Sequence, residues 1–340
     1  MLKIEILYYV KNYILLIAIL ILAICFFIPI SSNGQLKWVN VDADFQPLPP
    51  NFHVYKTENR FNGKPFIAYY AKAKLKDKEI DFTTDTTFKR RLTPLEFYNK
   101  NAKPLLVVNG TFFSFATNQN LNIVIKGGKL LSYNVHSVPL KGKDTFQFKH
   151  PLGSAIGIDK KGNADIAWLY TDSASAYAYA SQTEMIPLKD SIPTHALDYY
   201  LKSSAIDNHL QAVVMKKWHM ATAIGGGPVL VQNSQIKVTN NEELKFIGNA
   251  INDKHPRTSM GYTKDGWLII IAIQGRFPGI AEGATLTEES QFLVELGCVE
   301  ALNLDGGGSS CMLINGKETI KPSDKIGQRP VPAVFIINKK

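Results

Sequence analysis

Short runs in which apolar and polar residues alternate recur along most of the chain after residue 65. A period of two places alternate side chains on opposite faces, so these runs predict β-strands. Glycine turns between neighbouring runs predict hairpins at 122–132 and 155–169. The other predicted strands cover residues 66–75, 105–108, 221–224, 267–274, 301–304 and 333–337.

Helical patterns are few. Thr93 followed by Pro94 predicts a short helix with a hydroxyl cap and proline in its first turn. A clearer helix is expected over 285–296, with two acids in its first turn and Gly297 as its stop. Many strands and few helices predict an α+β fold, with a mixed, strand-rich sheet core and few flanking helices.

The amino terminus has a different character, because residues 13–30 carry no charge and Lys3 and Lys11 precede them. This apolar run is long for a signal peptide and near the lower limit for a membrane span. We therefore expect residues 1–30 to form a cytoplasmic stub and a transmembrane signal anchor. Basic residues on the amino-terminal side then place the remaining chain in the periplasm or outside the cell. Cleavage after Ser32 is the alternative.

The rest of the chain divides into a lead-in and one large domain. Residues 31–64 contain three prolines and little periodicity, which predicts a tether leading onto the body. Residues 65–340 are expected to form a single domain. Within it, residues 170–217 show the least regular pattern and are interpreted as a variable insertion.

Charge and composition narrow the function classes. The chain has 340 residues, a formal net charge of +9 and a pI near 9.2. Its lysines are scattered over strand edges and loops, without a basic helix or recognition motif, so we exclude nucleic acid as a partner. A mild positive field suits an anionic substrate or a negatively charged envelope.

Cysteine and histidine usage gives no metal signature. Beyond Cys25, only Cys298 and Cys311 are present, so one disulfide and two buried thiols are both open interpretations. No closely spaced cysteine pair or paired-histidine motif predicts a zinc site. We expect no metal and no cofactor, although a divalent cation beside an acidic site residue is left open.

The most informative segment is 301–310, a short apolar run that leads into Asp305, three glycines, Ser309 and Ser310. Glycine allows positive φ and lets a ligand approach the backbone closely. A tight turn needs only one or two glycines, whereas this run places three between an acid and two hydroxyls. We interpret it as a ligand-binding loop.

Four further segments predict loops of the same kind at strand ends: 109–111, 225–228, 255–261 and 274–276. Each places polar side chains beside glycine, so we expect them to converge on one site. The planar guanidinium of arginine can donate two hydrogen bonds to phosphate oxygens, while amide and hydroxyl side chains can form hydrogen bonds with sugar hydroxyls. The predicted substrate-binding residues are Asn109, Gly110, Thr111, Gly226, Gly227, Arg257, Thr258, Arg276, Gly306, Gly307, Ser309 and Ser310.

Carboxylates in this set point to hydrolysis at an anomeric carbon, which commonly uses two carboxyl groups. Asp305 is the first candidate for the catalytic carboxylate and Glu288 the second, although an acid in a first helical turn also complements the helix dipole. His255 is interpreted either as a proton shuttle or as a structural residue.

Read in chain order, several motifs resemble the phosphodiester glycosidase family over residues 65–337. They lie at 107–113, 224–228, 256–258 with Gly261, 275–276, 285–288, 303–310 and 329–331. The resemblance implies cleavage of glycosyl phosphodiesters, but it identifies neither the sugar nor the acceptor. Gln274 departs from the family pattern, in which aspartate commonly precedes the Gly-Arg pair. The predicted anchor makes the chain resemble a bacterial envelope member.

The expected function is therefore hydrolysis of a sugar-1-phosphodiester in an envelope glycan or exopolysaccharide, by an enzyme anchored in the membrane. Two alternatives remain. The first, favoured by Gln274, is a glycan- or sugar-phosphate-binding protein without turnover. The second is a phosphodiesterase that cuts the phosphorus–oxygen bond, for which no cluster of acids and histidines is visible in the sequence.

Overall fold

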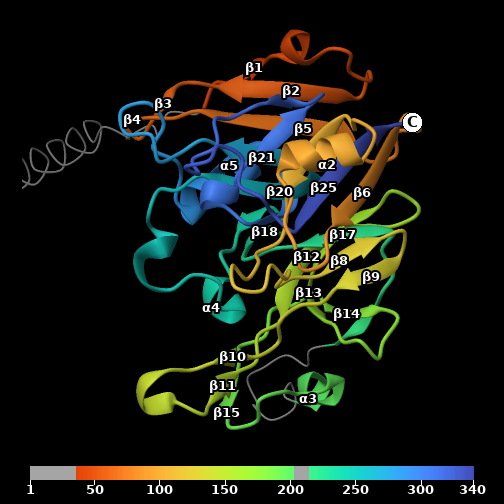
Figure 1. Cartoon of the computed structure of the whole chain (residues 1–340), viewed down its shortest axis with the longest axis vertical. Coiled ribbons are helices and arrows are strands. Elements are labelled where there is room, and N and C mark those ends of the chain that lie inside the picture. The colour runs from red at the N-terminus through yellow and green to blue at the C-terminus, as the bar shows by residue number, and fades with distance from the viewer. Residues whose placement is uncertain (1–35, 203–213) are drawn as a thin grey trace, which may run out of the picture. The chain divides into compact units, whose positions relative to one another are not determined.

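The computed structural model describes residues 36–202 and 214–340, in which antiparallel sheets dominate and helices are few (Figure 1). Residues 37–340 form one compact unit. The strand-rich, sheet-dominated core is confirmed. The expected mixed sheet is wrong for this part of the chain, because every strand pair described is antiparallel. Tight hairpins such as residues 257–273 supply antiparallel partners without a helical crossover.

The largest sheet joins strands from both ends of the compact unit. Its eight strands, in spatial order, are β1 (Val39–Asn40), β2 (Phe52–Thr57), β5 (Ala68–Lys74), β21 (Trp267–Ile273), β20 (Arg257–Thr263), β22 (Cys298–Asn303), β18 (Val229–Gln232) and β19 (Gln235–Ile236). Strand β21 lies between β5 and β20 and is buried along nearly its whole length, which explains its continuous apolar sequence.

This sheet contradicts two predictions made from the sequence. The tether expected over residues 31–64 is wrong for β1 and β2, since Phe52 and Val54 alternate with more exposed residues and enter the core. The ligand loop expected over 255–261 is also wrong in part, because Arg257–Thr263 form a central strand. Many side chains of this strand are polar, so it lacks the alternating apolar pattern from which the other strands were predicted.

Two further sheets complete the body. The seven-stranded sheet contains β16 (Lys216–Trp218), β14 (Ala178–Ser181), β13 (Ala164–Tyr170), β12 (Gly153–Ile158), β17 (Thr222–Gly225), β8 (Val124–Lys126) and β9 (Lys129–Ser132). The five-stranded sheet contains β24 (Lys317–Glu318), β23 (Met312–Ile314), β7 (Leu106–Asn109), β25 (Ala333–Lys339) and β6 (Ile80–Thr86). Strands β14 and β16 show that residues 170–217 supply part of the main structure.

Two small sheets lie outside these three. One pairs β10 (Val138–Pro139), β11 (Phe148–Lys149) and β15 (Lys189–Asp190), and it lies at the bottom of Figure 1 beside α3 (Leu197–Lys202). The other is the hairpin of β3 (Arg60–Phe61) and β4 (Lys64–Pro65). The first small sheet includes β15, which lies within residues 170–217, the segment with the least regular sequence pattern.

Two helices begin where the sequence predicts them, after Thr93 and Thr285, whereas the short helix at 240–243 was not predicted. The structure has α2 (Pro94–Lys100) and α5 (Leu286–Glu295), each with a threonine capping box, and the short α4 (Asn240–Glu243). Its 3₁₀ turns are η1 (Asp42–Phe45), η2 (Gly142–Asp144), η4 (Gly248–Ile251) and η5 (Gly307–Ser309). Helix α5 packs on β18 and β22.

None of the helices in residues 36–202 and 214–340 has the length and apolar character to cross a membrane. The anchor predicted over residues 1–30 lies outside the described residues.

The main hydrophobic core draws side chains from all three large sheets, among them Leu302 of β22, Ile156 of β12 and Phe335 of β25. Cys298 and Cys311 are buried free thiols, so the disulfide interpretation is wrong. Burial raises the pKa of the Cys298 thiol to about 12, which keeps it protonated and unreactive at neutral pH.

A buried carboxylate ties the sheets together. Glu243, at the end of α4, is 3% exposed. Its Oε2 accepts hydrogen bonds from the backbone nitrogen and hydroxyl of Ser154, at 3.1 and 2.7 Å. Its Oε1 accepts from Trp168 Nε1 at 3.2 Å, Val229 N at 2.8 Å and Thr239 Oγ1 at 2.7 Å. Five donors therefore satisfy this charge, and they come from strands of two sheets and the α4 cap.

Candidate functional site

The predicted ligand loop begins where β22 ends, and neighbouring strand ends hold it in place. The backbone nitrogen of Asp305 donates to the carbonyl of Gly110 at 2.9 Å. The Asn109 amide donates to the Asp305 carbonyl at 2.5 Å. Segments nearly 200 positions apart in the sequence therefore meet at Asp305.

Asn109 and Thr258 support this junction from beneath. Both are fully buried, and Asn109 Oδ1 accepts from Thr258 Oγ1 at 2.9 Å and from Cys311 N at 3.0 Å. All polar atoms of the Asn109 amide therefore have protein partners close to Asp305. This arrangement favours a positioning role for both residues over the predicted contact with sugar hydroxyls.

Because the loop glycines have no side chains, the guanidinium groups of two arginines fit against the loop. A Cβ atom on Gly307, whose φ is +61°, would lie 2.9 Å from Arg276 Nη2. A Cβ atom on Gly308 would overlap the guanidinium of Arg329. Side chains at these positions would therefore occupy the space of the guanidinium groups, which accounts for the run of glycine.

Arg276 and Arg329 differ in how firmly they are held. Arg276 is exposed and has a left-handed backbone φ of 65°. Its backbone nitrogen donates to the Glu282 carbonyl at 3.5 Å, but its guanidinium forms no hydrogen bond or ion pair with the described residues. Arg329 donates from Nε to Asp324 at 2.6 Å and from Nη1 to Ser309 Oγ at 3.3 Å. Strained backbone geometry is common at functional sites. The guanidinium of Arg276 is therefore less constrained than that of Arg329, which is compatible with the phosphate contact predicted for it.

Arg329 lies beside the loop, although it was not among the substrate-binding residues predicted from the sequence. The signal for it was present, because residues 329–331 form one of the motifs that carry the family resemblance. Its position beside Ser309 depends on a chain reversal that no local pattern predicts.

The carboxyl group of Asp305 is a weaker acid than that of an ordinary aspartate. Burial raises its pKa to about 7, against the opposing effects of the Ser309 hydroxyl, the positive charge of Arg329 and the Gly306 backbone. Asp305 nevertheless keeps partial solvent exposure. Near neutral pH it exists in both protonation states, which suits proton transfer.

Arg257 has a different environment from Arg276. It is 2% exposed, and its Nε donates to the Ala284 carbonyl at 3.0 Å. Its Nη2 donates to the carbonyls of Ala250 and Asp253 at 3.3 and 3.1 Å. These contacts occupy much of the guanidinium and do not favour the phosphate contact predicted for Arg257.

Glu288 caps α5. Its Oε2 accepts from the Thr285 backbone nitrogen at 2.9 Å, and its Oε1 accepts from Asn62 at 3.1 Å and pairs with Lys254 at 3.0 Å. Asp305 is not among these partners. The geometry supports the helix-capping interpretation, and a catalytic role for Glu288 stays a prediction.

The remaining predicted residues lie around the loop. Ser310 is fully buried, and its hydroxyl has no partner among the described residues. The Thr111 hydroxyl donates to Asn120. Gly226 and Gly227 donate from their backbone nitrogens to Ser154 and Asn303, which ties the end of β17 to β12 and β22. Thr111, Gly226 and Gly227 thus have structural partners, and no contact here assigns them to a ligand.

Two residues that remained ambiguous have defined environments. Burial, together with the charges of Arg257 and Arg276, lowers the pKa of His255, so its ring is neutral at pH 7. Gln274 is 8% exposed, and its Oε1 accepts from the Lys321 backbone nitrogen at 2.9 Å. Gln274 therefore fixes a neighbouring loop in this chain.

Glu289 is a buried acid that the sequence assigned only to the helix dipole. It is 0% exposed, and burial raises its pKa from 4.5 to about 8, against the opposing effects of Arg257 and Ser259. The folded protein therefore binds this proton more tightly than the unfolded chain does. Its contribution to stability is complete below about pH 4.5 and is lost as the pH rises to about 8.

We accordingly predict that the free energy of unfolding falls by roughly 3 kcal/mol between pH 4.5 and pH 7 because of this group. Urea unfolding at several pH values checks this. Glu289→Gln should flatten the dependence, and the slope that remains should reflect the other groups with shifted pKa values, Asp305 among them. Equal slopes in the variant and the parent would contradict the assignment.

The fold and the site together define a protein of stacked antiparallel sheets in which one acidic group and two arginines surround a glycine loop. Residues 198–338 match the profile of the family described as phosphodiester glycosidase. This part of the chain is therefore similar to the phosphodiester glycosidase family.

Curated relatives match over shorter stretches. Mouse N-acetylglucosamine-1-phosphodiester alpha-N-acetylglucosaminidase is 32% identical over 102 residues, which cover 30% of this chain and 19% of that protein. An uncharacterised SPbeta prophage-derived protein of Bacillus subtilis is 37% identical over 86 residues, 25% of this chain and 13% of its own. The chain thus spans less than one fifth of the length of these relatives.

Solved structures match over most of the chain at low identity. The zebrafish N-acetylglucosamine-1-phosphodiester alpha-N-acetylglucosaminidase catalytic domain, auto-inhibited by its pro-peptide, gives a TM-score of 0.56 and 18% identity, covering 90% of each chain. A putative exported protein from Burkholderia pseudomallei gives 0.55 and 17%, covering 83% of this chain and 75% of its own. At such identities these matches show the fold.

Proposed function

We propose that this protein hydrolyses glycosyl-1-phosphodiesters and releases free sugar. The observation that carries the proposal is the placement of Asp305, with its pKa near 7, on a glycine loop. Two arginines flank this loop, Arg329 and Arg276, and the Arg276 guanidinium has no partner among the described residues. Support also comes from the family and from the relatives named for cleavage of a sugar–phosphodiester link.

Asp305 acts at the anomeric carbon in its ionised form, either as base toward water or as nucleophile. Arg276 and Arg329 hold the phosphodiester and stabilise the phosphate that leaves, so little proton donation to the leaving oxygen is needed. Asn109 and Thr258 fix the Asp305 backbone, and Ser309 links its carboxyl group to Arg329.

The substrate we propose is a sugar-phosphate linkage in an envelope glycan or exopolysaccharide. The formal charge of +9 supports an anionic polymer as substrate. The apolar run at 13–30 supports attachment to the membrane, with the catalytic domain in the periplasm or outside the cell.

The test is turnover of UDP-N-acetylglucosamine and a panel of sugar-1-phosphodiesters by the full-length protein in ¹⁸O-labelled water, followed by NMR and mass spectrometry. Free sugar labelled at C1 establishes a glycosidase. Inversion at C1 identifies Asp305 as a base, and retention identifies it as a nucleophile. Sugar phosphate that carries the label would instead establish a phosphodiesterase.

A binding protein without turnover is the second candidate. The contacts of Glu288 favour it, because this second predicted carboxylate is committed to helix capping and to Lys254. Saturable line broadening of a glycosyl phosphodiester, with no product after hours, would support binding and overturn the hydrolase.

Arg276→Ala is expected to lower kcat/KM by roughly 10- to 100-fold, because it removes a charge-assisted hydrogen bond to phosphate. Steady-state kinetics measure this, and Arg276→Lys should restore part of the loss. The control is Arg60→Ala, since Arg60 is exposed and, among the described residues, its side chain donates only to the Gly63 carbonyl. Equal kinetics for the Arg276 and Arg60 variants would remove Arg276 from the site.

A further inference from the structure

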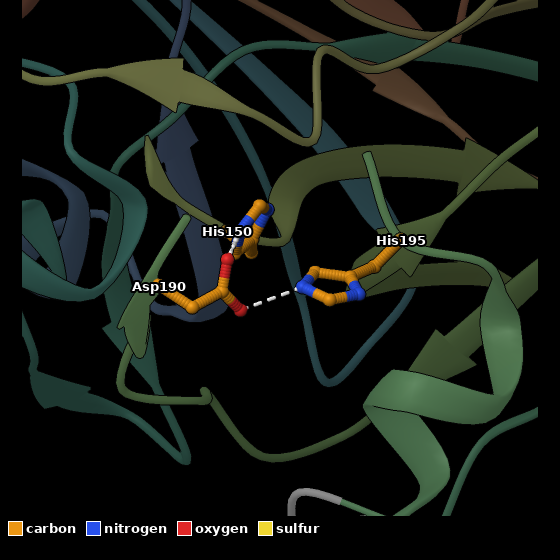
Figure 2. Close-up of side chains that lie close together, drawn as sticks. All are labelled: His150, Asp190 and His195. Atoms are coloured by element: carbon orange, nitrogen blue, oxygen red, sulfur yellow. Dashed lines mark hydrogen bonds and ion pairs between the residues drawn. The ribbon is translucent and has the colours of Figure 1, made fainter. Parts of the chain in front are cut away.

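A second cluster of chemically active side chains lies in the small sheet of β10, β11 and β15. His150 follows β11, Asp190 ends β15, and His195 precedes α3. Figure 2 shows the two imidazole rings turned toward the one carboxylate. The His150 Nε2 lies 3.1 Å from Asp190 Oδ1, and the His195 Nε2 lies 2.7 Å from Asp190 Oδ2.

The rings are held in place by packing. The His150 side chain is 0% exposed and that of His195 is 11% exposed, whereas Asp190 keeps 30%. The His195 ring stacks on Tyr199 with a centroid distance of 3.7 Å, and it meets the edge of His150 at 4.3 Å. The three side chains are therefore pre-positioned, with one opening to solvent beside the carboxylate.

The polar partners of His150 are few. Its Nδ1 has no hydrogen-bond partner among the described residues, so Nε2 makes the ring's one polar contact there, to Asp190. A fully buried imidazole is costly unless its polar atoms find strong partners. A cation between the rings and the carboxylate would give the His150 Nε2 such a partner.

We propose that His150, Asp190 and His195 bind a divalent transition metal ion of the Zn²⁺ class. Two imidazole nitrogens and one carboxylate oxygen are a donor set that zinc accepts, with the fourth position left to water. The three ligand atoms lie within 4.8 Å of one another. Zinc bonds of roughly 2.0–2.1 Å place tetrahedral ligands about 3.3 Å apart, so small side-chain shifts admit the ion.

Such an ion would fasten the segment that contains β15 and α3 to the body of the protein. Asp190 and His195 lie within residues 170–217, whereas His150 lies directly after β11, outside that segment. Residues 150 and 190 are too far apart in sequence for a metal-binding motif to be visible, which is why the sequence predicted no metal. The site is independent of Asp305 and of the proposed hydrolysis.

The test is metal binding by the untagged full-length protein after treatment with a chelator. Titration with Co²⁺ should give one equivalent of bound ion with the visible absorption of low-coordinate cobalt, and Zn²⁺ should displace it. Asp190→Asn and His195→Gln should each weaken binding by at least roughly 100-fold, as expected for the loss of one of three ligands. The matched control is His53→Gln, because His53 also pairs with an aspartate, Asp42, at 2.8 Å, but no third potential ligand joins this pair in the part of the chain that the structure describes.

Thermal unfolding gives a second readout that does not depend on the variants. Zn²⁺ should raise the Tm of the wild-type protein by several degrees, because an ion that binds only the folded state stabilises it. No bound Co²⁺ and an unchanged Tm would overturn the proposal and leave a hydrogen-bonded His–Asp–His cluster. Equal binding by the wild type and by folded Asp190→Asn and His195→Gln proteins would overturn it as well.

Discussion

Asp305→Asn is expected to lower kcat for glycosyl phosphodiester hydrolysis by at least roughly 1,000-fold, because the amide can neither accept a proton nor attack carbon. Its shape keeps the loop contacts through the backbone of Asp305, so the fold should persist. Initial rates under saturating substrate, together with circular dichroism, measure both effects. Asp81→Asn is the control, since its carboxylate is 49% exposed and lies 3.9 Å from the nearest cationic nitrogen, that of Lys340.

The pH profile gives an independent check of the same carboxylate. Because Asp305 acts ionised and its pKa is about 7, activity should rise as the pH increases toward 7 and level off above it. A normal rate in Asp305→Asn, or a profile without this limb, would contradict the assignment. Glu288→Gln keeps the capping box, so a large loss of kcat in that variant would restore Glu288 to catalysis.

Glu243→Gln is expected to lower the free energy of unfolding by about 3 kcal/mol, with little direct effect on chemistry. The carboxylate accepts five hydrogen bonds from Ser154, Trp168, Val229 and Thr239. An amide nitrogen in place of either oxygen would face at least two of these donors. The N–H groups among them would then be buried without an acceptor, whereas the hydroxyls could turn to accept from the amide.

Urea unfolding of the parent and variant proteins measures this loss. Glu242→Gln is the matched control, because Glu242 lies next to Glu243 on α4 and is only partly buried. We expect the control to change the free energy of unfolding by less than about 0.5 kcal/mol. Similar values for both variants would show that the Glu243 contacts add little stability.

Local signals in the sequence were sufficient for much of the fold. The apolar run at 267–274 became β21, and the threonine before residues 286–295 became the cap of α5. The convergence of strand ends on Asp305 was also predictable, since glycine and polar residues follow Asn109 and Leu304 directly. In each case the residues that define the element are adjacent in the sequence.

What could not be predicted depends on partners far away in the chain. Strand β20 is rich in polar residues because Arg257 and Thr258 have buried partners that no local pattern shows. The commitment of Arg257 to backbone carbonyls, and the freedom of Arg276, follow from the three-dimensional arrangement alone. The same holds for the three ligands of the proposed metal site.

The pairing of β5 with β21 has a consequence for biosynthesis. Residues 68–74 lie beside residues 267–273, so the centre of the largest sheet forms only after most of the chain has left the ribosome. Until then, β5 has only β2 as a partner and presents an open strand edge. Non-local pairing of this kind slows folding and exposes apolar edges to other chains. Production of the protein should therefore benefit from slow synthesis at low temperature.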